Sequence, residues 1–254
     1  MSRKSEAWLR EQRATIGGGA AAQAIGISPL GSPDELAQVM RGIIIPPDIS
    51  DLSPVRCGRL LEPLAVQLLE ELLERKIERH DQDNFLYNSK FPWAHALPDG
   101  WLHEDGKFDP QTSELVEIKV PTPATCKRIE AEGLSEQWIV QAQHYMMVTE
   151  TMRANFGILN PSPFVLQVKH HVVERDQELI DRLIVCEREF WDKLQAGEEL
   201  PRESATFIWT QTDEVRTLET PEAIETARAF LVARDQRDNG ESDLEAARAV
   251  LLEL

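Results

Sequence analysis

The segment Leu97–Val120 reads LPDGWLHEDGKFDPQTSELVEIKV, and both the fold and the chemistry can be approached from it. It begins with a Pro-Asp-Gly turn around Asp99, continues through a turn-rich interval, and ends in a strand-like run containing Glu117, Ile118 and Lys119. Side chains alternate between the two faces of a strand, so Glu117 and Lys119 share one face while Ile118 points to the other. The segment therefore predicts a carboxylate and an ammonium group side by side on a strand.

These residues can form a site for a divalent cation. If Asp99 lies beside Glu117, their carboxylates and the Ile118 carbonyl supply the oxygen ligands that a hard cation such as Mg²⁺ prefers. Alone, a Glu-x-Lys triplet on a half-exposed strand is more often a solvated ion pair. The other face of the strand carries apolar side chains that would anchor it on a core, namely Val116, Ile118 and Val120.

Such a site suits the hydrolysis of a phosphodiester. This reaction needs a positioned water, stabilisation of charge on the phosphoryl oxygens and help for the departing oxygen, which two metal ions roughly 3.5–4 Å apart supply together. Asp99 is the candidate bridging ligand, and Glu117 with the Ile118 carbonyl completes one site. Lys119 would orient or deprotonate the attacking water.

Two other stretches offer further candidate groups. Gln141 and Tyr145 are four residues apart on a predicted helix, so they share a face where the amide could hold Lys119 or the water and the phenol could touch a phosphate. A buried structural glutamine is the alternative. Glu62 could reach the second metal ion, or it could be a favourable charge near a helix start. His144 is predicted to be a packing residue rather than a general base.

The composition predicts a soluble globular protein with an ample core. The chain has 254 residues, of which 42% are hydrophobic, and this fits a domain over residues 1–200 with an acidic helical extension over 201–254. Its charged start and the lack of a stretch of about 18 apolar residues predict neither export nor membrane insertion. The widely spaced cysteines argue against structural zinc, an iron–sulfur cluster and a disulfide framework, and favour a reducing cytoplasm: Cys57, Cys126 and Cys186.

A net charge of -17 opposes binding to nucleic acid, which normally draws on clustered Lys and Arg. The acidic residues are dense in the stretches 70–78 and 214–253, however, and basic residues cluster near the amino end: Arg3, Lys4, Arg10 and Arg13. A basic channel on an acidic body is therefore compatible with this composition. Bound divalent ions would also offset the carboxylates of the site.

Periodicity and turn residues predict the order of elements. Helices are expected over residues 8–13, 20–25, 32–41, 58–79, 136–149 and 176–194, with acidic helices from residue 221 onwards. Strands are expected over residues 84–87, 93–97, 100–103, 115–120, 155–159 and 164–173. Helices followed by a sheet that a helix interrupts predict an α/β or α+β fold with a mixed central sheet.

Several short motifs, in this order, resemble one known nuclease family. The similarity spans about residues 8–173, and the family is that of lambda-type exonucleases, or YqaJ-like viral recombinase nucleases. The motifs are Trp8 with Arg13, Ile16-Gly17-Gly18, Gly58-Arg59-Leu60-Leu61-Glu62-Pro63, Pro98-Asp99-Gly100, Glu117-Ile118-Lys119 and Gln141-Ala142-Gln143-His144-Tyr145.

The resemblance implies a restriction-endonuclease-like core of the PD-(D/E)xK class. It also implies Mg²⁺-dependent 5′-to-3′ digestion of one strand of linear duplex DNA, with two ions per site that Mn²⁺ could replace. The expected setting is a bacterial or phage-encoded homotrimer that leaves 3′ overhangs for a single-strand annealing protein in phage-type recombination.

By position, the resemblance places the metal ligands on Asp99, Glu117 and the Ile118 carbonyl. It places the lysine on Lys119 and the glutamine on Gln141. The family's helix glutamate falls on Glu62, and its arginine for the 5′ phosphate falls on Arg13.

Two departures concern the phosphate at the DNA end. Gly19 and Leu97 stand where the family commonly has phosphate-binding serines. Either backbone amides around Gly19 replace the lost hydroxyl groups, as the start of a helix can, or the enzyme relies less on a 5′ phosphate.

Two alternatives remain open. One is a structure-specific or phage-type endonuclease, because the same metal site serves both kinds of cleavage. The other is a catalytically silent DNA-binding or assembly protein, which the net charge keeps in consideration.

Overall fold

The computed structural model describes residues 5–104, 106–162 and 165–202. These belong to the first of two compact units of the chain, Met1–Phe207. The predicted domain boundary near residue 200 lies at the end of the described part, and the predicted acidic helices lie outside it, so both stay predictions. None of the helices among the described residues is long and apolar enough to span a lipid bilayer.

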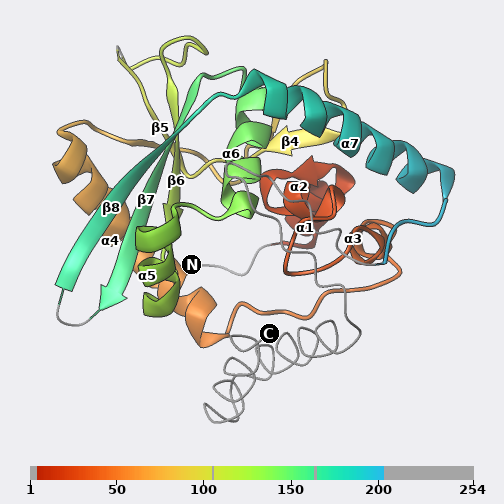
Figure 1. Ribbon diagram of the computed structural model, residues 1–254, viewed down its shortest axis with the longest axis horizontal. Coiled ribbons are helices and arrows are strands. Elements are labelled where there is room, and N and C mark those ends of the chain that lie inside the picture. Colours follow the sequence, from red (N-terminus) through yellow and green to blue (C-terminus); the bar gives the residue numbers. More distant parts are fainter. Residues whose placement is uncertain (1–4, 105, 163–164, 203–254) are drawn as a thin grey trace, which may run out of the picture. The chain divides into compact units, whose positions relative to one another are not determined.

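A five-stranded mixed sheet forms the centre of this unit (Figure 1). Its strands lie in the order β2 (Glu78–Arg79), β5 (Gly100–Leu102), β6 (Glu114–Lys119), β7 (Arg153–Ser162) and β8 (Val165–Glu174). β6 and β7 are parallel, and the other neighbours are antiparallel. The predicted α/β class with a mixed central sheet is thus confirmed.

Helix α4 (Ser53–Leu73) covers one face of the sheet. Its apolar stripe packs against the inward side chains of β6, β7 and β8 in a continuous core, whose buried members include Ala65, Val66, Leu69, Val116, Ile118, Leu159 and Val168. Removing this much apolar surface from water supplies the main driving force for folding. The prediction that Val116, Ile118 and Val120 anchor the strand on a core is confirmed.

Helices α5 (Pro123–Glu132) and α6 (Glu136–Thr149) lie on the opposite face. Trp138 of α6 stacks on Phe156 of β7, and Lys169 of β8 forms an ion pair with Glu130 of α5. Every residue of α6 from Val140 to Thr149 is buried, because α2 (Gly18–Ala24) and α7 (Gln177–Ala196) cover its other sides. Figure 1 shows α6 between the large sheet and α2.

A smaller sheet brings the amino-terminal region to α6. It consists of β1 (Ile16–Gly17), β4 (Ala94–Ala96) and β3 (Leu86–Tyr87), in the order β1-β4-β3. α1 (Glu6–Ala14) precedes β1, while α3 (Pro33–Met40) follows α2 and begins with a capping box at Ser32 and Glu35. β1 thereby holds the glycine run next to α6.

The structure corrects the predicted bounds of the long helix 58–79. α4 begins at Ser53, before a proline that suits a first helical turn, and ends at Leu73. Glu74 then adopts a left-handed conformation with φ 52°, and Arg79 lies on β2. Glu62 therefore lies in the helix interior before Pro63, and the reading as a charge near the helix start is wrong.

One helix was not predicted at all. α5 begins after Thr122, whose hydroxyl accepts a hydrogen bond from the Thr125 N–H, and has Pro123 in its first turn. Both are ordinary start signals for a helix. Only Cys126 and Ile129 of α5 are buried, so its apolar periodicity is weak.

Gly100 provides a test of this packing. A Cβ at this position would lie 2.7 Å from the backbone oxygen of Glu78, which the pairing of β2 with β5 holds in place. We expect Gly100→Ala to lower the free energy of unfolding by about 1–3 kcal/mol in urea denaturation. Gly58→Ala is the matched control, because nothing lies within 4 Å of its added Cβ and alanine favours a helix interior. Equal stability of Gly100→Ala and the parent would contradict the expectation.

Candidate metal centre

Asp99 lies where the pairing between β5 and β6 ends. The last paired residues are Gly100 and Val116, and the Asp99 N–H donates to the Val116 carbonyl over 3.1 Å. One step further, Oδ2 of Asp99 accepts a hydrogen bond from the Ile118 N–H over 2.7 Å. The Asp99 carboxylate therefore accepts the hydrogen bond that a backbone carbonyl of a longer β5 would have accepted from the Ile118 N–H.

The Ile118 carbonyl faces the same side as Asp99. In an extended strand the N–H and C=O of one residue point toward the same neighbouring strand. Because the Ile118 N–H points to Asp99, the Ile118 oxygen does so too. A carboxylate and a carbonyl oxygen thus converge at the open end of β5.

Glu117 and Lys119 share the face of β6 that α6 covers. Lys119 Nζ lies 2.6 Å from Glu117 Oε1 and 3.1 Å from Gln141 Oε1. The Gln141 amide nitrogen donates to the same Glu117 oxygen over 2.8 Å. Strand alternation and one turn of α6 therefore bring together the three polar side chains that the sequence singled out.

The second carboxylate oxygen of Glu117 is buried and has no hydrogen-bond partner among the described residues. A buried carboxylate oxygen without a partner is costly, since the charged group has lost water and gained nothing in return. A divalent cation between Glu117, Asp99 and the Ile118 carbonyl would satisfy it with the oxygen ligands that Mg²⁺ prefers. The residues present therefore fit such an ion.

The electrostatics of Asp99 favour the same conclusion. Burial, and next the charge of Glu117, raise the pKa of Asp99 from 3.8 to about 8, while Lys119 and the Ile118 N–H act in the opposite direction. The negative charges of Asp99 and Glu117 repel each other, and a cation bound between them would remove this repulsion.

Glu62 is near this centre but engaged elsewhere. Its charge contributes to the raised pKa of Asp99, yet its carboxylate forms an ion pair with Arg79 on β2. Among the described residues, no three His, Cys, Asp or Glu side chains are grouped as a metal cluster. A ligand role for Glu62 stays a prediction and requires release from Arg79.

Tyr145 extends the series of hydrogen bonds that runs from Lys119 to Gln141. Its hydroxyl donates to the Leu97 carbonyl over 3.1 Å and accepts from the Gln141 amide nitrogen over 3.3 Å. Burial, and then the charge of Glu117, raise its pKa well above the ordinary value. The phenol thus contacts protein groups on both sides, and its predicted contact with a phosphate stays a prediction.

The residues predicted for the DNA end lie on α1 and α2. Arg13 is in the last turn of α1 and is half-buried, and Gly19 is exposed with open space around it. Between them, a Cβ on Gly18 would lie 2.4 Å from the Tyr145 ring. The Tyr145 side chain therefore separates Gln141 from the segment Ile16–Gly19, where β1 passes directly into α2 and which is called the glycine turn below.

Two results concern residues outside the predicted set. His144 is fully buried and hydrogen-bonded to Glu187 and to the His95 carbonyl, which confirms it as a packing residue. Trp138 was not singled out, although Lys119 Nζ lies 5.7 Å from the centre of its ring. Its place one turn before Gln141 on the same helix was the available signal.

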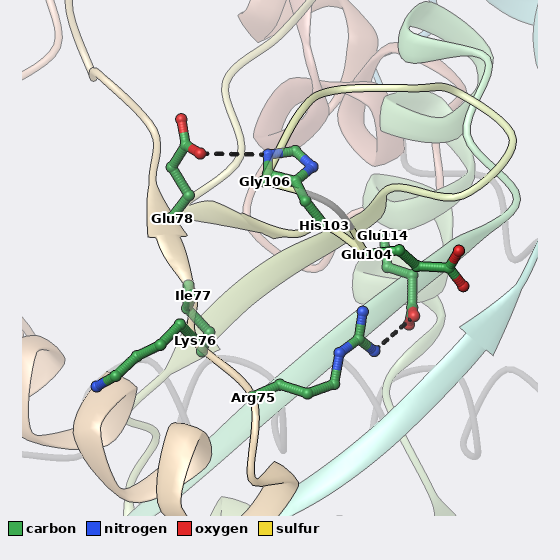
Figure 2. A pocket seen from close by; sticks show the side chains of 8 residues that line it. All are labelled: Arg75, Lys76, Ile77, Glu78, His103, Glu104, Gly106 and Glu114. Atoms are coloured by element: carbon green, nitrogen blue, oxygen red, sulfur yellow. Dashed lines mark hydrogen bonds and ion pairs between the residues drawn. The ribbon is translucent and has the colours of Figure 1, made fainter.

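A separate cavity of about 570 Å³ lies at the other end of β5 and β6 (Figure 2). Two of its charged side chains pair with each other, Arg75 lying 2.7 Å from Glu114, and His103 lies 3.6 Å from Glu78. Among the described residues, the buried carboxylate oxygen without a partner belongs to Glu117 instead, so the metal centre is the better candidate site.

Comparisons with known proteins show the family of this chain. Residues 7–152 match the family model of the YqaJ-like viral recombinase domain. "Uncharacterized protein YqaJ" of Bacillus subtilis (strain 168) is 30% identical over 195 residues, which are 75% of this chain and 57% of that protein. The chain thus spans a little over half the length of this curated relative.

Solved structures show the same fold. An alkaline exonuclease, LHK-Exo from Laribacter hongkongensis, superposes with a TM-score of 0.62 at 18% identity, covering 76% of this chain and 94% of that one. Its complex with dAMP superposes with a TM-score of 0.61 at 20% identity over the same shares.

Proposed function

Because this chain belongs to the family of YqaJ-like viral recombinase domains, we propose that it is a metal-dependent DNA exonuclease. It digests one strand of linear duplex DNA in the 5′-to-3′ direction and leaves 3′ single-stranded overhangs for recombination by strand annealing. The fold shared with an alkaline exonuclease supports this proposal.

The partnerless oxygen of Glu117 carries the proposal. Beside Asp99 and the Ile118 carbonyl, this buried oxygen creates a need for positive charge that a bound cation would meet. Asp99, Glu117 and Ile118 would hold Mg²⁺, or Mn²⁺ in its place, and Glu62 would reach a second ion. Bound there, the ions would polarise the phosphoryl group and lower the pKa of a water.

The chain's own groups would position the reactants. Lys119 has three N–H donors, of which Glu117 and Gln141 take two, so one is left for the attacking water or a phosphoryl oxygen. Gln141 fixes both Lys119 and Glu117, because its amide oxygen accepts from one and its nitrogen donates to the other. α6 thus holds the lysine at a fixed distance from the metal ligands.

The decisive experiment compares linear duplex DNA, labelled separately at each end, with covalently closed circles. Each is incubated with Mg²⁺ or EDTA, using the parent and Asp99→Ala. We expect Mg²⁺-dependent loss of linear DNA from the 5′ end, intact circles and no cleavage by the variant. Cutting of circles would indicate an endonuclease, and no cleavage by folded protein would indicate a silent DNA-binding module.

Arg13 is proposed to bind the 5′ phosphate of the digested strand. We expect Arg13→Ala to slow digestion from 5′-phosphorylated ends by about tenfold to a hundredfold, since a charge-assisted contact contributes about 1.5–3 kcal/mol. Digestion from 5′-hydroxyl ends should change little. The measurement is the ratio of the two initial rates, and an unchanged ratio would refute the assignment. Arg182→Ala is the control, because Arg182 is an exposed residue of α7 paired with Glu178.

The same proposal includes an assembly and a partner. A homotrimer would enclose the duplex and keep the enzyme on it, and a single-strand annealing protein would take up the overhang. Sedimentation equilibrium of the purified chain measures its oligomeric state. A monomer at the concentration used for digestion would refute the homotrimer.

A further inference from the structure

His144 and Glu187 form a buried pair next to the glycine turn, and this pair has no part in the proposed chemistry. His144 Nδ1 of α6 is 2.7 Å from Glu187 Oε1 of α7, and both side chains are completely buried. The Trp93 indole N–H donates to the other Glu187 oxygen over 3.3 Å. Glu187 thereby ties α7 to α6 and to the residue before β4.

The other nitrogen of His144 reaches β4. His144 Nε2 is 3.0 Å from the His95 carbonyl, which can only accept, so this nitrogen carries a hydrogen. Burial lowers the pKa of His144, but the charge of Glu187 and contacts with the His95 and Ile16 backbone outweigh it, so the pKa is raised. Both ring nitrogens of His144 are therefore hydrogen-bonded, Nδ1 with the Glu187 carboxyl group and Nε2 with the His95 carbonyl.

His95 connects the Glu187–His144 pair to the glycine turn. It is the register partner of Gly17 in the parallel pairing of β4 with β1. A Cβ on Gly17 would lie 2.6 Å from the His95 ring, and the Thr15 hydroxyl lies 2.8 Å from His95 Nδ1. The imidazole of His95 is thus in van der Waals contact with the turn on one side and is fixed by Thr15 on the other.

Stability alone is a weak reason for such a pair. A buried ion pair often stabilises no more than apolar residues of the same volume would, but it allows only one geometry. Here that geometry links α7, α6 and β4 to the turn, and α6 also carries Gln141 of the metal centre.

We propose that the Glu187–His144 pair positions the glycine turn Ile16–Gly19, and through it the 5′-terminal nucleotide of the digested strand. Both residues are positioning residues, because neither touches the DNA. The inference rests on the proposed function, in which Arg13 binds the 5′ phosphate, and it adds the backbone of this turn to the same binding site.

Glu187→Gln tests the pair, because it removes the charge and keeps the shape. With Mg²⁺ fixed, the preference of the parent for 5′-phosphorylated over 5′-hydroxyl ends should fall by about tenfold to a hundredfold, the effect of misplacing a bound group by about 1 Å. The matched control is Glu189→Gln, which removes an exposed carboxylate on the same helix that pairs with Lys193. It should keep the parental preference.

A merely structural role predicts a different result. Rates from both kinds of end would then fall together, in proportion to the folded fraction measured by circular dichroism, and the preference would be unchanged. That outcome would overturn the inference.

If Glu187→Gln does not fold, Thr15→Val tests the last step of the proposed connection, which runs from the pair through His95 to the glycine turn. It removes only the hydroxyl that holds His95, at a partly exposed position, and should also lower the preference. The parent reports separately on the proposed function: a parent without cleavage would overturn both proposals, whereas a parent that digests both kinds of end equally would overturn this inference and the Arg13 assignment but not the exonuclease activity. A parental preference left intact in the folded variants would overturn this inference alone.

Discussion

Replacement of Lys119 with alanine is expected to reduce cleavage by about 10²–10⁴-fold while duplex binding stays near that of the parent. The ammonium group lies between Glu117 and Gln141, where its remaining donor can reach a water or a phosphoryl oxygen. Its contribution is therefore made to the chemical step. Binding of the duplex depends on many phosphate contacts and should survive the loss of one charge at the reaction centre.

Single-turnover cleavage and fluorescence anisotropy of a labelled duplex separate the two effects. Lys169→Ala serves as the control, because Lys169 is a lysine of the same sheet whose exposed ammonium pairs with Glu130. It removes the same charge outside the metal centre and should keep both properties. Equal losses of cleavage and binding in folded Lys119→Ala would refute a role in the chemistry.

The part of this site that the sequence predicted depends on short-range geometry. Glu117 and Lys119 share a face because strands alternate, and Gln141 and Tyr145 share a face because helices repeat every 3.6 residues. Both rules act within a few residues, so spacing alone indicated them. The resemblance to a nuclease family then related the two elements to Asp99.

What the sequence did not show depends on contacts between distant segments. The pairing of Glu62 with Arg79 arises only because the chain reverses after α4, at Glu74, which adopts a left-handed conformation without being glycine. No turn residue marks that reversal, so the helix was extended to residue 79. The partnerless oxygen of Glu117 likewise follows from the burial of a whole face by α6 and not from any local pattern.

The same difference between local patterns and long-range contacts explains which elements of the fold were predicted correctly. The elements 136–149 and 100–103 were predicted within one residue of their observed bounds, because their periodicity and flanking residues agree. α5 was missed because so little of it is buried. The order of strands in the sheet was not predicted, because pairing joins segments that are far apart in the sequence.

Asp99→Asn is expected to abolish cleavage and also to change how stability depends on pH. The amide can still accept from the Ile118 N–H, but it has lost the charge that would bind the ion. Metal-assisted stabilisation of a transition state amounts to several kcal/mol, so cleavage should fall by more than about a hundredfold. The fold should be retained.

The effect on stability follows from the raised pKa of Asp99, which is about 8 in the folded protein against 3.8 as the ordinary value. Between these values the folded state binds the proton that the unfolded state has released. The free energy of unfolding of the metal-free parent therefore falls as pH rises from about 4 to about 8, by up to about 1.4 kcal/mol per pH unit. The amide introduced by Asp99→Asn does not titrate, so the variant should lack this decline and be the more stable protein in EDTA at pH 8.

Mg²⁺ should make the parent more stable than Asp99→Asn. An ion bound to the folded parent at a hundred times its Kd adds about 2.7 kcal/mol, and the variant should gain little. Urea denaturation between pH 5 and pH 8, with EDTA or with Mg²⁺, measures both effects, and Asp192→Asn on the exposed face of α7 is the control. If Asp99→Asn keeps the stabilisation by Mg²⁺, then the ion binds elsewhere and Asp99 is not its ligand. If the variant loses this stabilisation and cleavage together, then Asp99 is a ligand of the ion that cleavage requires.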